Sequence, residues 1–120
     1  MLKNLSFIVV VLTICGCATT YTGKKDEKYY QKLWCGQQKG IMEYVLDDST
    51  RVDCLTDRYA VEVDWDHKWA EGVGQAQYYA EKTGRKPGLL LITDKNGQRF
   101  VKRAKTAGRC SGLEVWTIDK

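Results

Sequence analysis

Two carboxylates that a short hairpin would bring together are the residues of this chain best placed to do chemistry. Residues 51–56 and 59–65 both have the composition of β-strands, and only two residues separate them. A two-residue hairpin loop fixes the strand register, so residue 53 should face residue 62. Asp53 and Glu62 would then lie about 5 Å apart at Cβ, where like charges repel. The pattern predicts a cation at this position, and a divalent metal ion suits paired carboxylates.

Polar groups on the following helix should flank these carboxylates. Side chains alternate along a strand, so Glu62 and Asp64 share one face of the strand at residues 59–65. A helix is predicted directly after it, over residues 67–82, and Gly84 ends it. One stripe of this helix is apolar. The stripe beside it consists of Lys68, Gly72, Gln75 and Tyr79. Because hardly any linker separates strand from helix, the second stripe should lie against the carboxylates.

The remaining segments predict an α/β fold. Residues 26–38 have the periodicity of an amphipathic helix, and residues 42–46 read as the first strand of an antiparallel meander. Residues 88–93 form a continuous apolar run, as expected of a strand covered on both faces. The segment 98–109 favours a helix, with a hairpin as the alternative, and residues 113–118 read as a closing strand. A strand, helix, strand order implies a right-handed parallel crossover.

The N-terminus has the pattern of an export signal. Lys3 precedes an apolar run over residues 5–14 that is too short to span a bilayer as a stable helix. The tetrapeptide Ile14-Cys15-Gly16-Cys17 resembles a bacterial lipobox, in which a small residue precedes the lipidated Cys. We expect acylation of Cys17. A plain secretory cleavage near Ala18 is the alternative.

This interpretation divides the chain into three parts. Residues 1–16 would be a lipoprotein signal peptide, residues 17–25 a polar tether, and residues 26–120 a single domain. No Asp follows Cys17, which by analogy with lipoprotein sorting favours the outer membrane, facing the periplasm. The formal net charge of +4 falls to +3 if Lys3 leaves with the signal peptide, which is mild. It permits contact with nucleic acid or anionic lipid and requires neither.

The cysteines predict at most one disulfide bond. Three of the five follow Cys17, and an odd number in an oxidising compartment leaves one thiol free. Cys54 lies in the middle of an apolar strand, which favours a role as a small core residue. Cys35 with Cys110 is therefore the favoured pair if a bond forms, although spacing alone does not decide it. No Cys/His spacing supports a zinc site.

The order of these elements and their polar positions resemble the PD-(D/E)xK, or restriction-endonuclease-like, nucleases. Asp53 matches the first acidic motif, and Glu62 matches the (D/E) of the second. Residues 75–79, Gln-Ala-Gln-Tyr-Tyr, match the QxxxY signature of the branch that contains recombination exonuclease domains. Glu43 would match the additional acidic residue that many members carry before the first motif. The resemblance spans residues 26–118.

Two positions depart from the family pattern. The Lys that normally follows the motif Glu by two residues is Asp64 here. Some members supply this Lys from the next helix, and Lys68 is the residue that could take that role, with Asp64 as a further metal ligand or a supporting group. A four-residue turn at 47–50 would place Tyr44, rather than Glu43, opposite the first acidic residue. A bulge or a longer turn would then be needed to bring Glu43 to the site.

The resemblance implies a metal-dependent nuclease that hydrolyses phosphodiester bonds of DNA. Asp53 and Glu62 would ligate Mg²⁺ or Mn²⁺. Lys68 would orient or activate the attacking water and offset phosphate charge. Gln75 would position that water or a phosphate oxygen, and Tyr79 would support Gln75.

Further contacts and a second function follow from the same resemblance. Candidate phosphate contacts are Arg51, Lys82, Arg85 and Lys86. The protein would bind the membrane through the N-terminal lipid. A homodimer would let so small a domain cut both strands of a duplex. The alternative function is a non-catalytic envelope lipoprotein that retains a nuclease-like fold for binding. The Asp at the family's Lys position favours that alternative, whereas the acidic pair and the QxxxY signature favour the enzyme.

Overall fold

The structure, a computed structural model, describes residues 23–120. The expected signal peptide, the lipidation site Cys17 and most of the tether lie outside the described residues. The helices and strands are α1 (Glu27–Gln37), β1 (Ile41–Val45), β2 (Arg51–Leu55), β3 (Tyr59–Trp65), α2 (Trp69–Thr83), β4 (Lys86–Thr93), α3 (Gln98–Ala107) and β5 (Glu114–Asp119). Within this part of the chain no helix has the length and apolar character needed to cross a membrane.

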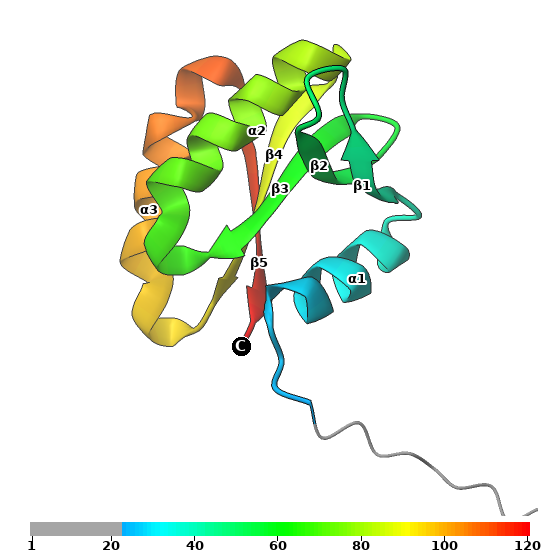
Figure 1. The fold of residues 1–120 in the computed structure, drawn as a ribbon. Coiled ribbons are helices and arrows are strands. Elements are labelled where there is room, and N and C mark those ends of the chain that lie inside the picture. Colours follow the sequence, from blue (N-terminus) through cyan, green and yellow to red (C-terminus); the bar gives the residue numbers. More distant parts are fainter. Residues whose placement is uncertain (1–22) are drawn as a thin grey trace, which may run out of the picture.

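Five strands form one mixed sheet between two helical layers, so the predicted α/β class is confirmed. The strands lie in the order β1-β2-β3-β4-β5, antiparallel from β1 to β3 and parallel from β3 to β5. Helix α1 covers one face of the sheet, while α2 and α3 cover the other (Figure 1). The predicted parallel crossover from β3 through α2 to β4 is present.

Both faces of β3 are covered, and the alternation of its side chains decides which helix each residue meets. Val61 and Val63 pack with Tyr30 and Trp34 of α1. The intervening Ala60, Glu62 and Asp64 point to the α2 side. The two acidic residues therefore lie under a helix and not on an open sheet face, which is the arrangement that the polar stripe of residues 67–82 predicts.

Several element boundaries differ from those predicted. A 3-10 turn, η1 (Asp66–Lys68), takes the first residues expected in the helix, so α2 begins at Trp69. Strand β4 begins at Lys86 rather than at residue 88, because Lys86 and Pro87 continue the parallel register with β3. The ambiguous segment forms the helix α3 and not a hairpin.

The register of the first hairpin also differs from the prediction. Val45, not Leu46, pairs with Arg51, because Leu46 closes the turn by donating its N–H to the carbonyl of Thr50. Met42 pairs with Cys54 and Tyr44 with Val52, so Glu43, rather than Tyr44, faces Asp53. Glu43 has a φ of +54°, and this local distortion replaces a regular pair at that point of the ladder.

The predicted disulfide pair Cys35–Cys110 is wrong. Cys35 of α1 is bonded to Cys54 of β2, whereas Cys110 is an exposed thiol. The physical reason is the side of the sheet: Cys54 faces α1, while Cys110 follows α3 on the other face. Gly40 is required beside the bond, since a Cβ there would lie 2.4 Å from the Cys54 sulfur. A bond closing a loop of this size stabilises by about 3 kcal/mol in the chain-entropy account.

Candidate active site

The hairpin of β2 and β3 brings Asp53 and Glu62 together as predicted. Cys54 pairs with Val61 and Leu55 with Ala60, and this register continues to Asp53 opposite Glu62. The regular ladder stops there because the Asp53 side chain enters it: the N–H of Val63 donates to Asp53 Oδ2 at 2.8 Å. The carboxyl groups of Asp53 and Glu62 lie within hydrogen-bonding reach of each other.

The carboxylates are buried and incompletely satisfied. Glu62 is 7% exposed and Asp64 is 4% exposed, which is unusual for ionisable side chains without a buried cation. Glu62 Oε2 is buried and has no hydrogen-bond partner among the described residues. An orphaned buried carboxylate oxygen costs stability, so native proteins retain one where it serves another purpose.

Burial and mutual repulsion keep protons on this cluster. Burial raises the pKa of Glu62 far above the ordinary carboxyl range, and the charge of Asp53 raises it further. Burial also raises the pKa of Asp53, against the hydrogen bond from Val63. Burial and the nearby Glu27 raise the pKa of Asp64 to about 6. A bound divalent cation would displace these protons, because opposite charge favours the ionised carboxylates.

Helix α1 contributes two residues that the sequence interpretation missed. Gln31, only 4% exposed, donates from Nε2 to Glu43 Oε1 at 2.9 Å and to the Asp53 carbonyl at 2.8 Å. Glu27, one helical turn earlier, lies within hydrogen-bonding reach of Asp64, and burial raises its pKa. The sequence did contain a signal for both residues, since Glu27 and Gln31 are four positions apart and so share one face of the helix.

Glu43 lies beside the carboxylate pair rather than within it. Besides Gln31, its carboxylate contacts Lys28 Nζ at 3.1 Å and Arg51 Nη1 at 3.8 Å. The hydrogen bond from Gln31 and the neighbouring cations hold the pKa of Glu43 below its usual value, despite some burial. Glu43 is therefore a paired carboxylate whose charge acts on Asp53 across the strand pair.

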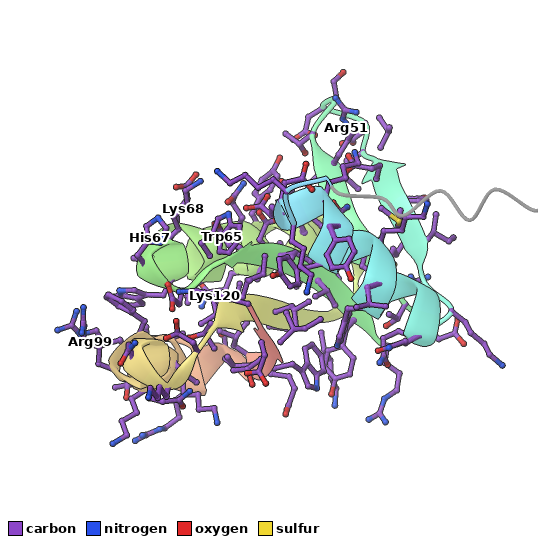
Figure 2. The ribbon with its side chains drawn as sticks, turned by 90° about the horizontal axis from the view of Figure 1, so that it is seen from below. Arg51, Trp65, His67, Lys68, Arg99 and Lys120 are labelled. Carbon is purple, nitrogen blue, oxygen red and sulfur yellow. A yellow bond between two sulfur atoms is a disulfide. The ribbon has the colours of Figure 1, made fainter. Side chains whose placement is uncertain are left out.

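Lys68 stands at the opening of the cluster, in the 3-10 turn before α2. Its Nζ is 3.9 Å from Asp64 Oδ1, and the side chain is about half exposed. Asp64 is fixed in turn, since its Oδ1 also accepts the N–H of Trp65 at 2.9 Å. Figure 2 shows Lys68 beside His67 and Trp65, well apart from Arg51. Lys68 and Asp64, the two residues at which the sequence departs from the pattern of the resemblance, are thus in contact.

The QxxxY residues also reach the site, through a close approach of α2 to the sheet. A Cβ on Gly72 would lie 2.7 Å from Leu89 Cδ1, so a larger residue there would force the Leu89 side chain to move. Tyr79 is buried, and Gln75 lies within hydrogen-bonding reach of its hydroxyl. Burial raises the pKa of Tyr79, and the charge of Glu62 adds to the effect, which places the hydroxyl beside the acidic cluster.

The predicted phosphate contacts at residues 82–86 do not reach the site. Lys82 Nζ pairs with Asp47 Oδ1 at 2.6 Å, and Arg85 Nη1 donates to the Thr56 carbonyl at 2.7 Å. Lys82 lies in the last turn of α2 and Arg85 shortly after its end, whereas Lys68 precedes its first turn. Fifteen helical residues separate the two ends, about 20 Å at 1.5 Å per residue.

The donor set suits a hard divalent cation. Residues 23–120 contain no group of three or more acidic, His or Cys side chains already arranged to hold a metal ion. Asp53 and Glu62 are two adjacent carboxylates, and Asp64 lies next to them. Mg²⁺ is typically bound by one or two carboxylates and completes its shell with water or phosphate oxygens. No protein-family model, curated protein or solved structure matches this chain.

The geometry of the site is therefore the evidence from which a function can be inferred. It combines paired buried carboxylates, one orphaned oxygen, a lysine at the opening, and an amide and a phenol behind. Such a group can hold a cation, orient a water molecule and neutralise an anionic substrate.

Proposed function

We propose that this chain is a metal-dependent nuclease of the restriction-endonuclease-like class that hydrolyses phosphodiester bonds of DNA. The observation that carries the proposal is the buried carboxylate of Glu62, orphaned at Oε2 and facing Asp53. A purely structural core gains nothing from such a pair, whereas a site that binds Mg²⁺ or Mn²⁺ requires one.

The arrangement of elements supports the finer fold assignment. Helix α1, the antiparallel strands β1 to β3, the crossover helix α2 and the parallel strand β4 follow the order that the resemblance implies. The two acidic motif positions lie on adjacent strands, and the QxxxY positions lie on the helix packed against them.

Each residue has a distinct part in the proposed reaction. Asp53 and Glu62 would hold the metal ion, which supplies Lewis acidity and lowers the pKa of water when bound. Lys68 holds a non-bridging phosphate oxygen and offsets the negative charge that develops there. Gln75, fixed by Tyr79, orients the attacking water. Asp64 positions Lys68 through their contact at the opening of the site.

A location in the cell envelope is part of the proposal, and it rests on the N-terminal sequence alone. Acylation of Cys17 would tether the domain to the membrane, most simply the outer membrane on its periplasmic side. A second candidate, a non-catalytic lipoprotein that keeps the fold for binding, is favoured by one observation: the family's Lys position is Asp64.

A cleavage assay distinguishes the two candidates. We expect the purified protein to degrade plasmid DNA with Mg²⁺ or Mn²⁺ and to lose this activity in EDTA. Asp53→Asn should lower the rate by about a thousandfold, since it removes one charged metal ligand. The matched control is Asp57→Asn, an exposed turn residue of the same hairpin. Absence of cleavage with either metal, or equal rates for wild type and Asp53→Asn, would contradict the proposal that the protein is an enzyme.

A further inference from the structure

The positive charge of the chain is concentrated on and around α3. The segment 95–113 contains six of the 19 Lys and Arg residues of the sequence and none of its 15 Asp and Glu residues. These cations are Lys95, Arg99, Lys102, Arg103, Lys105 and Arg109. The net charge of +4 therefore conceals a molecule with one strongly basic helix.

These six cations are free to bind an external anion. All six are exposed, and within residues 23–120 none forms an ion pair with a carboxylate. Other cations are engaged: Lys82 pairs with Asp47, and Lys120 with Asp66. Val101 and Ala104 are the buried residues of α3, so the basic side chains point away from the core. Such a surface attracts polyanions.

Aromatic groups lie among these cations. A groove between α2 and α3 is lined by Trp69, Lys102, Arg103, Thr106 and Ala107, and most of its lining is apolar. The guanidinium of Arg99 lies 4.4 Å from the centre of the Phe100 ring, and that of Arg103 lies 5.8 Å from it. An apolar groove that is edged by Lys102 and Arg103 and holds a partly exposed aromatic ring has the two features that bind unpaired nucleotides, cations and a stacking face.

The groove and the proposed active site each include a residue at the N-terminal end of α2. Trp69 follows Lys68 directly, and Lys68 contacts Asp64 at the opening of the carboxylate cluster. Figure 2 shows Lys68 and His67, at the start of α2, at the same end of the molecule as Arg99, at the start of α3. The carboxylates lie on the β2 side of α2, whereas α3 lies on its β4 side. A strand leaving the groove would therefore pass round the N-terminal end of α2, by way of Lys68, to reach Asp53 and Glu62. The acidic cluster by itself would repel a polyanion, which a second, basic surface has to offset.

We propose that the α3 groove, defined by Trp69, Lys102, Arg103, Thr106 and Ala107, binds a single nucleic-acid strand. Lys102 and Arg103 contact phosphates, and Trp69 stacks on a base. The partly exposed Trp69 ring offers a face on which a base can stack, a contact that a lipid phosphate does not make. The direction of the strand towards Lys68 rests on the proposed function, but binding in the groove requires no metal.

Fluorescence anisotropy with a labelled single-stranded oligonucleotide in EDTA tests this inference without cleavage. We expect Lys102→Glu/Arg103→Glu to weaken binding by about tenfold or more. The slope of log K against log salt should fall by about 1.4, at about 0.7 for each phosphate that the variant no longer neutralises. The matched control is Lys32→Glu/Lys39→Glu, which makes the same charge change on and after α1. Thermal melts should show all variants folded, because every substituted side chain is exposed.

Three outcomes would overturn the inference: no binding by wild type, equal weakening in the control pair, or tighter binding to a duplex of the same sequence. A fourth is loss of binding to phosphatidylglycerol vesicles with oligonucleotide binding unchanged, which would mark a membrane surface instead. Failure of the two proposals is distinguishable. Groove binding without metal-dependent cleavage removes only the nuclease. Metal-dependent cleavage by a protein whose oligonucleotide binding in EDTA is the same in the groove variants as in wild type removes only the groove.

Discussion

Glu62→Gln should strongly lower the rate of metal-dependent cleavage while leaving the metal-free protein as stable as wild type or more stable. Loss of a charged metal ligand should lower the rate by about a thousandfold. The same change removes a buried carboxylate that burial and Asp53 destabilise, and it leaves an amide of equal shape. Removing such a destabilising group typically raises the free energy of unfolding by about 1 kcal/mol, which corresponds to about 5 °C in Tm.

The difference in Tm between Glu62→Gln and wild type should depend on pH, and its direction distinguishes a buried carboxyl group from a residue that does not titrate. The folded pKa of Glu62 is raised, so between its unfolded and folded pKa values the folded state binds more protons. The stability that the protonated Glu62 side chain contributes to the folded state is therefore fully present below its unfolded pKa. That stability is lost as the pH rises through the folded pKa. In EDTA, the Tm advantage of Glu62→Gln should widen from about pH 5 to about pH 8. Scanning calorimetry measures it, with Glu114→Gln, an exposed acid on β5, as the matched control.

The opposite result has a clear meaning. If Glu62→Gln unfolds several degrees below wild type in EDTA near neutral pH, the carboxylate stabilises the fold and is not a destabilising ligand kept for function. If the variant cleaves DNA like wild type, Glu62 has no part in the chemistry.

Lys68→Met should lower the rate of cleavage by about a hundredfold or more, without loss of metal affinity. A cation that stabilises charge on the reacting phosphate contributes an effect of this size. The substitution removes a positive charge 3.9 Å from Asp64, so metal binding should be unchanged or slightly tighter. Lys68 is about half exposed, which limits the change in stability to a few tenths of a kcal/mol. Single-turnover cleavage and a metal titration of the same variant separate the two effects.

A neighbouring control and a compensating variant sharpen this test. His67→Ala alters the adjacent exposed residue and should cleave within about threefold of wild type. Asp64→Lys combined with Lys68→Met moves the cation to the position that the resemblance assigns to it, and should recover part of the lost activity. Wild-type rates for Lys68→Met would show that the lysine at the opening takes no part in the reaction.

The hairpin and the carboxylate pair could be predicted from the sequence because both depend on local rules. Strict alternation over Tyr59–Trp65 and a two-residue loop leave one register, and β3 has the predicted bounds. The polar stripe of α2 was predictable for the same reason, since helical periodicity places Gln75 and Tyr79 on the face that meets the strand. The Lys86-Pro87 start of β4 was missed because proline reads as a strand breaker, although the first residues of a strand tolerate it.

The features that escaped prediction depend on how α1 packs across the sheet. Contacts of Gln31 with Glu43 and Asp53, of Glu27 with Asp64, and of Cys35 with Cys54 all join α1 to strands β1 to β3. Periodicity identifies the helix and its buried face, but it does not specify which face of the sheet the helix covers. That choice decides the disulfide partner and adds an acidic residue to the cluster.

The most direct measurement is a titration of the protein with Mn²⁺, followed by the electron paramagnetic resonance signal of the free ion. The structure predicts at least one site per chain, competition by Mg²⁺, and loss of the site in both Asp53→Asn and Glu62→Gln. Asp57→Asn should bind like wild type, since its carboxylate is exposed and remote from the cluster. A free-ion signal unaffected by millimolar protein, or binding retained in both site variants, would contradict a metal site at Asp53 and Glu62.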